Sequence, residues 1–379
     1  MLNALREFQI GRPQIFAGML LLVFAVQCLW VASGRRYSDL EYEYMASGHR
    51  SLPGQEFRVT SPVTAVVAAF PLRLAEAIRP ALPARMKAAM AIPPLWWLRL
   101  PFVIFGVWLG GALWWVARRL FGNPGGYVAL GLYCASPAMA KAASNIGPEI
   151  ILAWGSFGLI YTAIGVAHTL YAPPRKWAPR IVLLGIALGL CAATMFWALA
   201  LVVPALAFML YLAPGRRDRA FLVMGGALGI GGVVMLVFKV LTGSFGLGSA
   251  ALITPKATIA LLQGLYFVVS DDQPGRFFLA VIFAAALGVY GLWDRSRYFG
   301  NSAPLFGGFL LVLMFALVPG IYLWTAPLGL AFCFVFIGGV AADLLEVSGT
   351  GLAWGLAAFL TLKFAFGLVF LGDWMHQIV

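Results

Sequence analysis

The sequence predicts an all-α, polytopic membrane protein, and its composition and its unbroken apolar runs predict this class. Hydrophobic residues make up 62% of the 379 residues and charged residues 11%, whereas a soluble domain is about 45–50% apolar and about 25% charged. Long continuous runs suit bilayer-spanning helices and not the alternating strands of a membrane barrel. We therefore expect a single integral membrane domain over residues 1–379, built as a helical bundle.

About eleven transmembrane helices follow from apolar length and from the charged residues between the runs. Residues 181–213 are divided into a hairpin, because one helix of that length would measure about 50 Å, against a hydrocarbon core of about 30 Å. The expected spans are residues 15–33, 97–117, 126–143, 150–171, 181–196, 198–213, 220–241, 277–293, 304–322, 326–343 and 351–371.

The basic residues predict the orientation of the chain. The short basic segments fall on one side of this arrangement: Arg118 and Arg119; Arg175, Lys176 and Arg180; Arg216, Arg217 and Arg219; Arg295 and Arg297; and, in the N-terminal tail, Arg6 and Arg12. Lys and Arg collect in cytoplasmic loops, so we expect a cytoplasmic N-terminus in the cell (inner) membrane. Anionic lipid explains the net charge of +12, and no nucleic-acid partner is expected.

Two longer segments, residues 34–96 and 242–276, are then outer loops. The first contains SPVTAVVAAFPLRLAEAIRP, whose apolar residues and occasional charges suit helices in the membrane interface. It also begins with three acids in five positions, Asp39, Glu41 and Glu43, directly after the first span. A cluster of carboxylates there indicates chemistry at the membrane surface.

The cysteines and histidines indicate no metal centre. Cys28, Cys134, Cys191 and Cys333 each lie inside an apolar run, which favours packing roles. The three histidines, His49, His168 and His376, are scattered. We therefore expect no protein-bound metal cluster, although the sequence leaves open whether a divalent cation takes part in the reaction.

Several passages carry a resemblance to a known family. The sequence from LRLPFVIFGVWLGGALWWVARRLFG through SPAMAKAASNIGPEIILAWGSFGLIY resembles the GT-C superfamily of polyprenyl-phosphate-sugar-dependent glycosyltransferases. It is most similar to the branch of the protein mannosyltransferases and aminoarabinose transferases. SDLEYEYMASGHRSLPGQEF is similar to the first outer loop of that family, where Asp39, Ala46 and Gly54 match the positions of a catalytic Asp, an Ala and a Gly. The resemblance implies the GT-C membrane fold and a transferase activity.

The chain also departs from the family pattern. Asp39-Leu40-Glu41 stands where many members have adjacent Asp and Glu, Glu149 stands where Asp is usual, and Met195 follows Thr194 where Lys often does. A sizeable outer C-terminal domain, common in the family, is also not expected here. These departures raise the alternative of a non-catalytic scaffold subunit.

The resemblance and the chemistry together predict a set of site residues. Asp39 would act as the general base that takes the proton of the acceptor hydroxyl, a role worth about 10²–10⁴ in rate. Glu149 would lie across the cavity and hold the acceptor or a divalent ion. Arg99 is the first candidate for the donor phosphate; the further candidates for binding substrate are Arg58, Lys141, Arg276, Lys256, Glu41 and Glu43.

Each of these roles has an alternative that the sequence leaves open. Asp39 could be a solvated acid paired with Arg35 or Arg36, and Glu149 could complement the dipole of a helix that begins at Pro148. The basic residues could anchor lipid head groups. Lys363, near the middle of the last span, marks function or a buried pair and motivates a weaker alternative, a lipid or solute transporter.

The sequence therefore predicts a membrane glycosyltransferase that moves a sugar from a polyprenyl-phosphate donor to an acceptor on the outer face. A lipid-linked sugar donor and membrane lipids are the expected partners. Partner subunits and the identities of the sugar and of the acceptor stay open.

Overall fold

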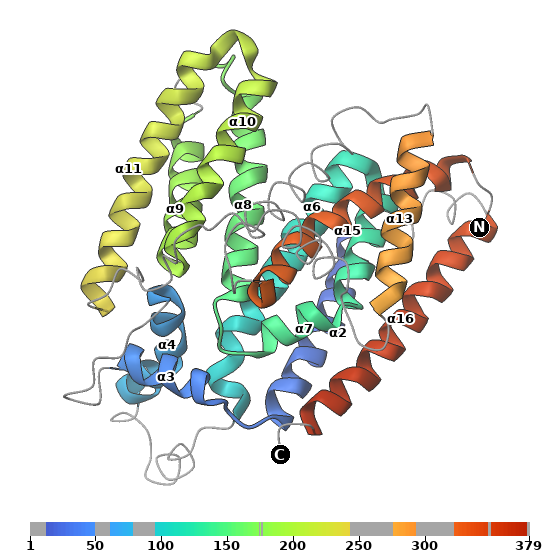
Figure 1. Ribbon diagram of the computed structural model, residues 1–379, viewed down its shortest axis with the longest axis horizontal. Helices are drawn as coiled ribbons and strands as arrows, with labels where there is room; N and C mark the ends of the chain where they lie inside the picture. The colour runs from blue at the N-terminus through green and yellow to red at the C-terminus, as the bar shows by residue number, and fades with distance from the viewer. Residues whose placement is uncertain are drawn as a thin grey trace. The chain divides into compact units, whose positions relative to one another are not determined.

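The computed structural model describes residues 13–49, 61–78, 95–173, 175, 177–242, 276–292, 322–347 and 350–376. All regular elements in these ranges are helices (Figure 1). This confirms the all-α class predicted from the apolar runs.

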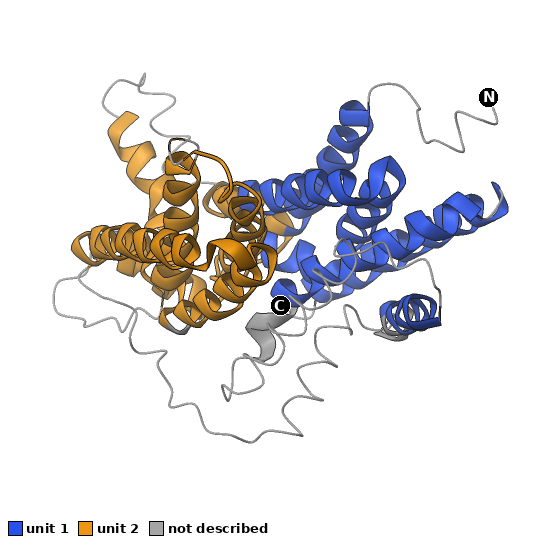
Figure 2. Ribbon diagram, turned by 90° about the horizontal axis from the view of Figure 1, so that it is seen from above, with its two compact units in different colours: residues 1–31, 104–143, 253–379 blue, residues 32–103, 144–252 orange. Residues whose placement is uncertain are grey.

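The described residues form two compact units, which Figure 2 shows in separate colours. Unit 1 contains residues 1–31, 104–143 and 253–379, and unit 2 contains residues 32–103 and 144–252. Two long helices, α2 (Pro13–Gly34) and α6 (Leu95–Cys134), contribute residues to both units, and the last residue of the short helix α7 (Pro137–Ser144) belongs to unit 2.

Within the described ranges, six helices are long and apolar enough to cross a membrane. These candidate spans are Pro13–Gly34, Leu95–Cys134, Glu149–Ala167, Pro214–Thr242, Pro327–Val347 and Thr350–His376. Shorter apolar helices span Ala178–Thr194, Ala198–Leu212 and Val281–Leu292. The chain is therefore a multi-pass membrane protein. The span at 304–322 lies almost wholly outside the described residues, so the total of eleven spans stays a prediction.

In unit 1, α6 contains the turn that the sequence predicted between residues 117 and 126. Gly122 has a φ of 76° there, a left-handed conformation that glycine adopts without steric cost. The predicted span 126–143 is wrong at its end, because α6 stops at Cys134 and a separate short helix, α7, runs from Pro137 to Ser144. The residue before a proline disfavours the helical conformation, so the helix breaks at Ser136.

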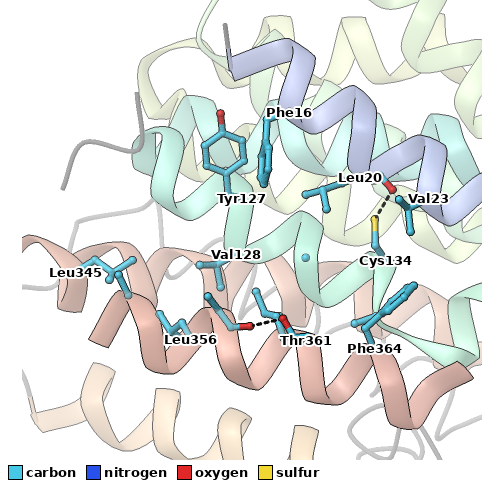
Figure 3. A pocket seen from close by; sticks show the side chains of 15 residues that line it. Phe16, Leu20, Val23, Tyr127, Val128, Cys134, Leu345, Leu356, Thr361 and Phe364 are labelled. Carbon is cyan, nitrogen blue, oxygen red and sulfur yellow. Dashed lines mark hydrogen bonds between the residues drawn. The ribbon is translucent and has the colours of Figure 1, made fainter. Parts of the chain in front are cut away.

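The other helices described in unit 1 are α13 (Arg276–Leu292), α15 (Tyr322–Val347) and α16 (Thr350–His376). Helices α2, α6, α15 and α16 enclose a cavity of about 390 Å³ (Figure 3). Its lining is almost wholly apolar and includes Phe16, Val128, Leu356 and Phe364. At the depth of the spanning helices, such a cavity excludes charged groups.

In unit 2, α8 (Glu149–Ala167), α9 (Ala178–Thr194), α10 (Val202–Leu212) and α11 (Arg217–Thr242) run side by side (Figure 1). Two short 3₁₀ helices, η3 (Phe196–Leu201) and η4 (Pro214–Arg216), precede α10 and α11. The expected spans 150–171 and 220–241 correspond to α8 and α11.

The division of residues 181–213 into a hairpin is confirmed. Met195 has an extended backbone between α9 and η3. At the other end, Arg219 in α11 donates to the carbonyl of Leu170 (2.9 Å), and its guanidinium lies 5.1 Å from the ring centre of Trp177, just before α9. Since α10 ends shortly before Arg219, α10 ends beside the start of α9, and the two helices run in opposite directions.

Most of the described residues in the segment predicted to be the first outer loop are helical as well. Helix α3 (Asp39–His49) packs against α4 (Pro62–Ile78), which lies inside the segment predicted to be an interfacial helix. The crossing is close at Gly48, where a Cβ would lie 2.0 Å from the carbonyl oxygen of Ala65 and 2.7 Å from the Cβ of Ala69. Only glycine allows this approach.

Candidate functional site

Glu41, one of the acids that follow α2, forms a capping box with Ser38 at the start of α3. The Glu41 N–H donates to the Ser38 hydroxyl (3.4 Å), and the Ser38 N–H donates to Glu41 Oε2 (2.8 Å). This reciprocal pair satisfies two donors that the first turn of a helix leaves without partners. It places Ser38 at the N-cap, Asp39 at the first helical position and Glu41 at the third.

Glu41 is buried and forms an ion pair with Arg99. Arg99 Nε donates to Glu41 Oε1 (3.0 Å), and Arg99 Nη2 donates to Glu41 Oε2 (2.9 Å), the bidentate geometry that a guanidinium favours. The Tyr37 ring covers the guanidinium at 4.7 Å from its centre, and the Tyr37 hydroxyl donates to the carbonyl of Leu95 (2.8 Å).

The remaining N–H groups of Arg99 bind the chain that leaves α2. Nη1 donates to the carbonyls of Ala32 (2.8 Å) and Arg35 (2.7 Å), and Nη2 donates to the carbonyl of Arg36 (2.9 Å). A guanidinium has five N–H donors, and all of them are used. Arg99 is also 0% exposed, so it has no donor left for a ligand.

Two further bonds join this segment to the turn before α8. The N–H of Ile146 donates to Glu41 Oε1 (3.0 Å), and Arg35 Nη1 donates to Asn145 Oδ1. The turn leads through Pro148 into Glu149, the first residue of α8. One carboxylate thus connects the loop that carries Asp39 with the turn that carries Glu149.

Glu149 folds back over its own turn. A Cβ added to Gly147 would lie 2.0 Å from Glu149 Oε2, so the carboxylate occupies the space that a side chain there would need. Oε2 is buried and has no hydrogen-bond partner within the described residues. A buried polar atom without a partner is costly, which makes Glu149 a candidate for contact with a bound molecule.

The ion pair determines the protonation of Glu41. Burial by itself would raise the pKa of Glu41, but the hydrogen bonds and charge of Arg99, with the N–H groups of Ile146 and Ser38, outweigh burial, and the pKa lies below its ordinary value. Burial also raises the pKa of Tyr37 to about 12. Glu41 is therefore an anion and Tyr37 a neutral hydroxyl at neutral pH.

The other predicted site residues lie on the exposed face of α3, in unit 1 or outside the described residues. Asp39 and Glu43 are exposed on α3, and Asp39 lies directly beside the capping box. The Lys141 ammonium belongs to unit 1, where it lies 4.0 Å and 4.7 Å from the ring centres of Phe370 and Trp374. The side chains of Arg58, Lys256 and Arg276 lie outside the described residues.

Two expectations change with this geometry. Arg99, expected to bind the donor phosphate, instead has its N–H groups on Glu41 and on backbone carbonyls. Glu41, expected to support substrate binding, is buried in the same ion pair. Because the ion pair and the backbone carbonyls use the N–H groups of Arg99, both side chains become candidates for positioning the site.

Sequence reasoning missed the residues that complete the cluster: Ser38, Tyr37 and the backbone N–H of Ile146. Ser38 could have been found, because Ser-x-x-Glu before a helix is the signature of a capping box. Tyr37 and Ile146 give no such local signal, since their roles depend on residues far away in the sequence.

Lys363, the charged residue expected near the middle of the last span, belongs to the other unit. Lys363 is buried in α16 of unit 1. Within the part of the chain that the structure describes, no three His, Cys, Asp or Glu side chains gather into a group that could hold a metal ion. The candidate site therefore consists of Asp39, Glu41, Arg99 and the turn before Glu149, all in unit 2.

Comparisons with known proteins agree with this architecture. Residues 80–242 match the family model of the dolichyl-phosphate-mannose-protein mannosyltransferases. ArnT from Cupriavidus metallidurans in the apo state has a TM-score of 0.61 and 16% identity, over 90% of this chain and 61% of that chain. ArnT bound to undecaprenyl phosphate gives 0.62 and 16%, over 90% and 63%. No curated protein matches the chain in sequence.

The oligosaccharyltransferase of Archaeoglobus fulgidus in the apo form is also similar, with a TM-score of 0.54 and 13% identity, over 93% of this chain and 54% of that chain. The chain thus spans less than two thirds of the length of each of these structures. Likeness at this identity concerns the fold. The chain resembles the GT-C glycosyltransferases, as its sequence predicted, and it has their membrane fold.

Proposed function

We propose that the chain is a membrane glycosyltransferase that moves a sugar from a polyprenyl-phosphate donor to an acceptor on the outer face of the membrane. An acceptor oxygen attacks the anomeric carbon, and the bond from that carbon to the phosphate oxygen breaks with inversion. The phosphate leaves with the bonding electrons, and Asp39 takes the acceptor proton. The likeness to ArnT bound to undecaprenyl phosphate supports a lipid-linked donor.

The observation that carries the proposal is the bond from the Ile146 N–H to Glu41 Oε1. It joins the backbone segment that carries Asp39 to the turn that carries Glu149, and both segments belong to unit 2. Asp39 itself is exposed at the start of α3, where an acceptor arriving from the membrane surface reaches it without any rearrangement of the core.

Glu149 takes the second role. Its buried Oε2 atom has no hydrogen-bond partner among the described residues, so an acceptor hydroxyl or a divalent ion would supply the missing contact. An ion coordinated by oxygen ligands needs several of them, and the substrate phosphate would have to provide part of the set. Arg58 and Glu43 remain candidates for binding substrate in this proposal, and the roles expected for Lys141, Lys256 and Arg276 stay predictions.

The orientation is part of the proposal. The basic residues of the turn between α8 and α9 and of the turn between α10 and α11 lie at one end of unit 2, as the contacts of Arg219 indicate. The positive-inside rule makes this end cytoplasmic. Helix α3 lies at the opposite end of unit 2 (Figure 1), so its start would face the outside of the inner membrane.

The test is turnover with defined donors. The full-length chain in lipid nanodiscs is incubated with a panel of undecaprenyl-phosphate-linked sugars and a membrane lipid extract as acceptor, and the release of undecaprenyl phosphate is measured. We expect release from at least one donor and a fall of about 10²–10⁴ in the Asp39→Asn variant. Asp218→Asn, an exposed acid in the first turn of α11, is the matched control.

The same experiment addresses the alternative of a non-catalytic scaffold. A folded wild-type chain that consumes no donor in the panel, together with an Asp39→Asn variant that supports growth like wild type, would favour the scaffold. Full turnover by Asp39→Asn would instead show that Asp39 is not the general base.

A further inference from the structure

We infer that Glu41 and Arg99 are positioning residues, which set the place of Asp39 relative to Glu149 and contact no substrate themselves. The inference concerns the same site as the proposed function and rests on it for its catalytic part. Its geometric part, the joining of two backbone segments by one buried ion pair, can be tested without any substrate.

Arg99 has the bonding pattern of a structural residue. Its N–H groups bind Glu41 and the carbonyls of Ala32, Arg35 and Arg36. These carbonyls lie at the end of α2 or just after it, where a helix leaves its last carbonyls without partners. Arg99 therefore ends α2 and directs the chain toward Ser38.

Glu41 joins the end of α2, which Arg99 binds, to two other segments of the chain. Oε2 accepts the N–H of Ser38 and closes the capping box, while Oε1 accepts the N–H of Ile146. Each oxygen also accepts one N–H of Arg99. A single carboxylate thus binds the start of α3, the start of α6 and the turn before α8.

Asp39 is fixed by this arrangement through its backbone. It stands between Ser38 and Glu41, both members of the capping box, and its side chain is free to meet solvent or substrate because Glu41 satisfies the first turn. Glu149 is fixed in the same way, three residues beyond Ile146. Catalysis needs its groups within a fraction of an ångström of the productive geometry.

The spacing Asp39-Leu40-Glu41 follows from this requirement. A capping box needs its acid at the third helical position, and Ser38 at the N-cap puts that position at Glu41. Asp39 then takes the first position, where its side chain is not used by the cap. The spacing therefore separates the positioning acid from the acid that meets the acceptor.

The first test measures geometry by amide hydrogen exchange of the full chain in nanodiscs. In Glu41→Gln and in Arg99→Lys we expect the amides of residues 38–41 and of Ile146 to exchange at least tenfold faster than in wild type. Glu76→Gln on the exposed face of α4 and Arg217→Lys at the start of α11 are the matched controls. Unchanged exchange at Ile146 in both site variants would overturn the inference.

The second test separates positioning from chemistry by turnover with the undecaprenyl-phosphate-linked sugar panel. We expect Glu41→Gln to lower kcat about ten- to hundredfold with little change in KM, and to cause no further loss in an Asp39→Asn background. Losses that multiply in the double variant would overturn the catalytic part. An Asp39→Asn variant with wild-type turnover would refute the proposed function while leaving the exchange result to stand.

A third, milder variant keeps the inference testable if the ion-pair variants do not fold. Ser38→Ala removes only the hydroxyl of the capping box and leaves the ion pair intact, so it should fold. We expect faster exchange at the amide of Glu41, which donates to that hydroxyl, with unchanged exchange at Ile146. The opposite pattern would contradict the division of roles between Ser38 and Glu41.

Discussion

Arg99 holds Glu41 with two N–H···O bonds of 3.0 and 2.9 Å, and both side chains are buried. Removing one partner of a buried ion pair leaves an uncompensated charge and costs about 3–5 kcal/mol. We expect Glu41→Gln and Arg99→Met each to lower the unfolding temperature of the detergent-solubilised chain strongly. The double variant should lose less than the sum of the two losses, and additive losses would contradict a direct pairing.

The same ion pair makes stability depend on pH in a defined direction. The pKa of Glu41 lies below its ordinary value, so its contribution is complete above the unfolded value of about 4.3 and is lost as the pH falls through the folded value. We expect the unfolding temperature of wild type to fall more steeply below about pH 4.3 than that of Glu41→Gln. Parallel curves for the two proteins would show that Glu41 is not the group responsible.

Substitution of Glu149 should lower the activity of the chain without lowering its stability. Its Oε2 atom is buried without a partner within the described residues, and a buried carboxylate is costly when no group compensates it. We expect Glu149→Gln to keep or raise the unfolding temperature while it lowers turnover by about 10- to 100-fold, the effect of losing a hydrogen bond between a charged group and the acceptor. Glu76→Gln controls for the change of charge, and a destabilised Glu149→Gln with full turnover would refute the assignment.

Gly48 should tolerate no side chain. A Cβ there would lie 2.0 Å from the carbonyl oxygen of Ala65, so α3 and α4 would have to separate, at a cost of about 1–3 kcal/mol. Thermal unfolding of Gly48→Ala should show this loss. Gly158 in α8 has nothing within 4 Å of an added Cβ, so Gly158→Ala should stabilise the chain by about 0.4–1 kcal/mol.

The orientation can be tested by labelling single cysteines in intact cells. Leu40 on α3 and Asp218 on α11 are both exposed, while the native cysteines are buried and give little background. A membrane-impermeant maleimide should label Leu40→Cys in intact cells and Asp218→Cys only after permeabilisation. The reverse pattern would place the start of α3 in the cytoplasm and exclude an outer-face site there.

The class of the protein and the limits of several helices could be predicted from the sequence. Apolar length and the charged residues between the runs predict residues 220–241, and α11 spans Arg217–Thr242. The hairpin at residues 181–213 followed from the thickness of a bilayer alone. These features are local or depend only on the solvent, so a single sequence contains the information that decides them.

The partners of the charged residues could not be predicted in this way, because they depend on contacts between distant segments. Arg99 and Glu41 are 58 residues apart, and Ile146 is 105 residues from Glu41. An arginine at the mouth of a span has the same local sequence whether it faces a phosphate or a carboxylate, and the outcome depends on which groups the fold buries beside it. Arg99 is buried, and a buried charge needs hydrogen-bond partners from the protein, here one carboxylate and three carbonyls. Only the packing of distant segments creates that burial.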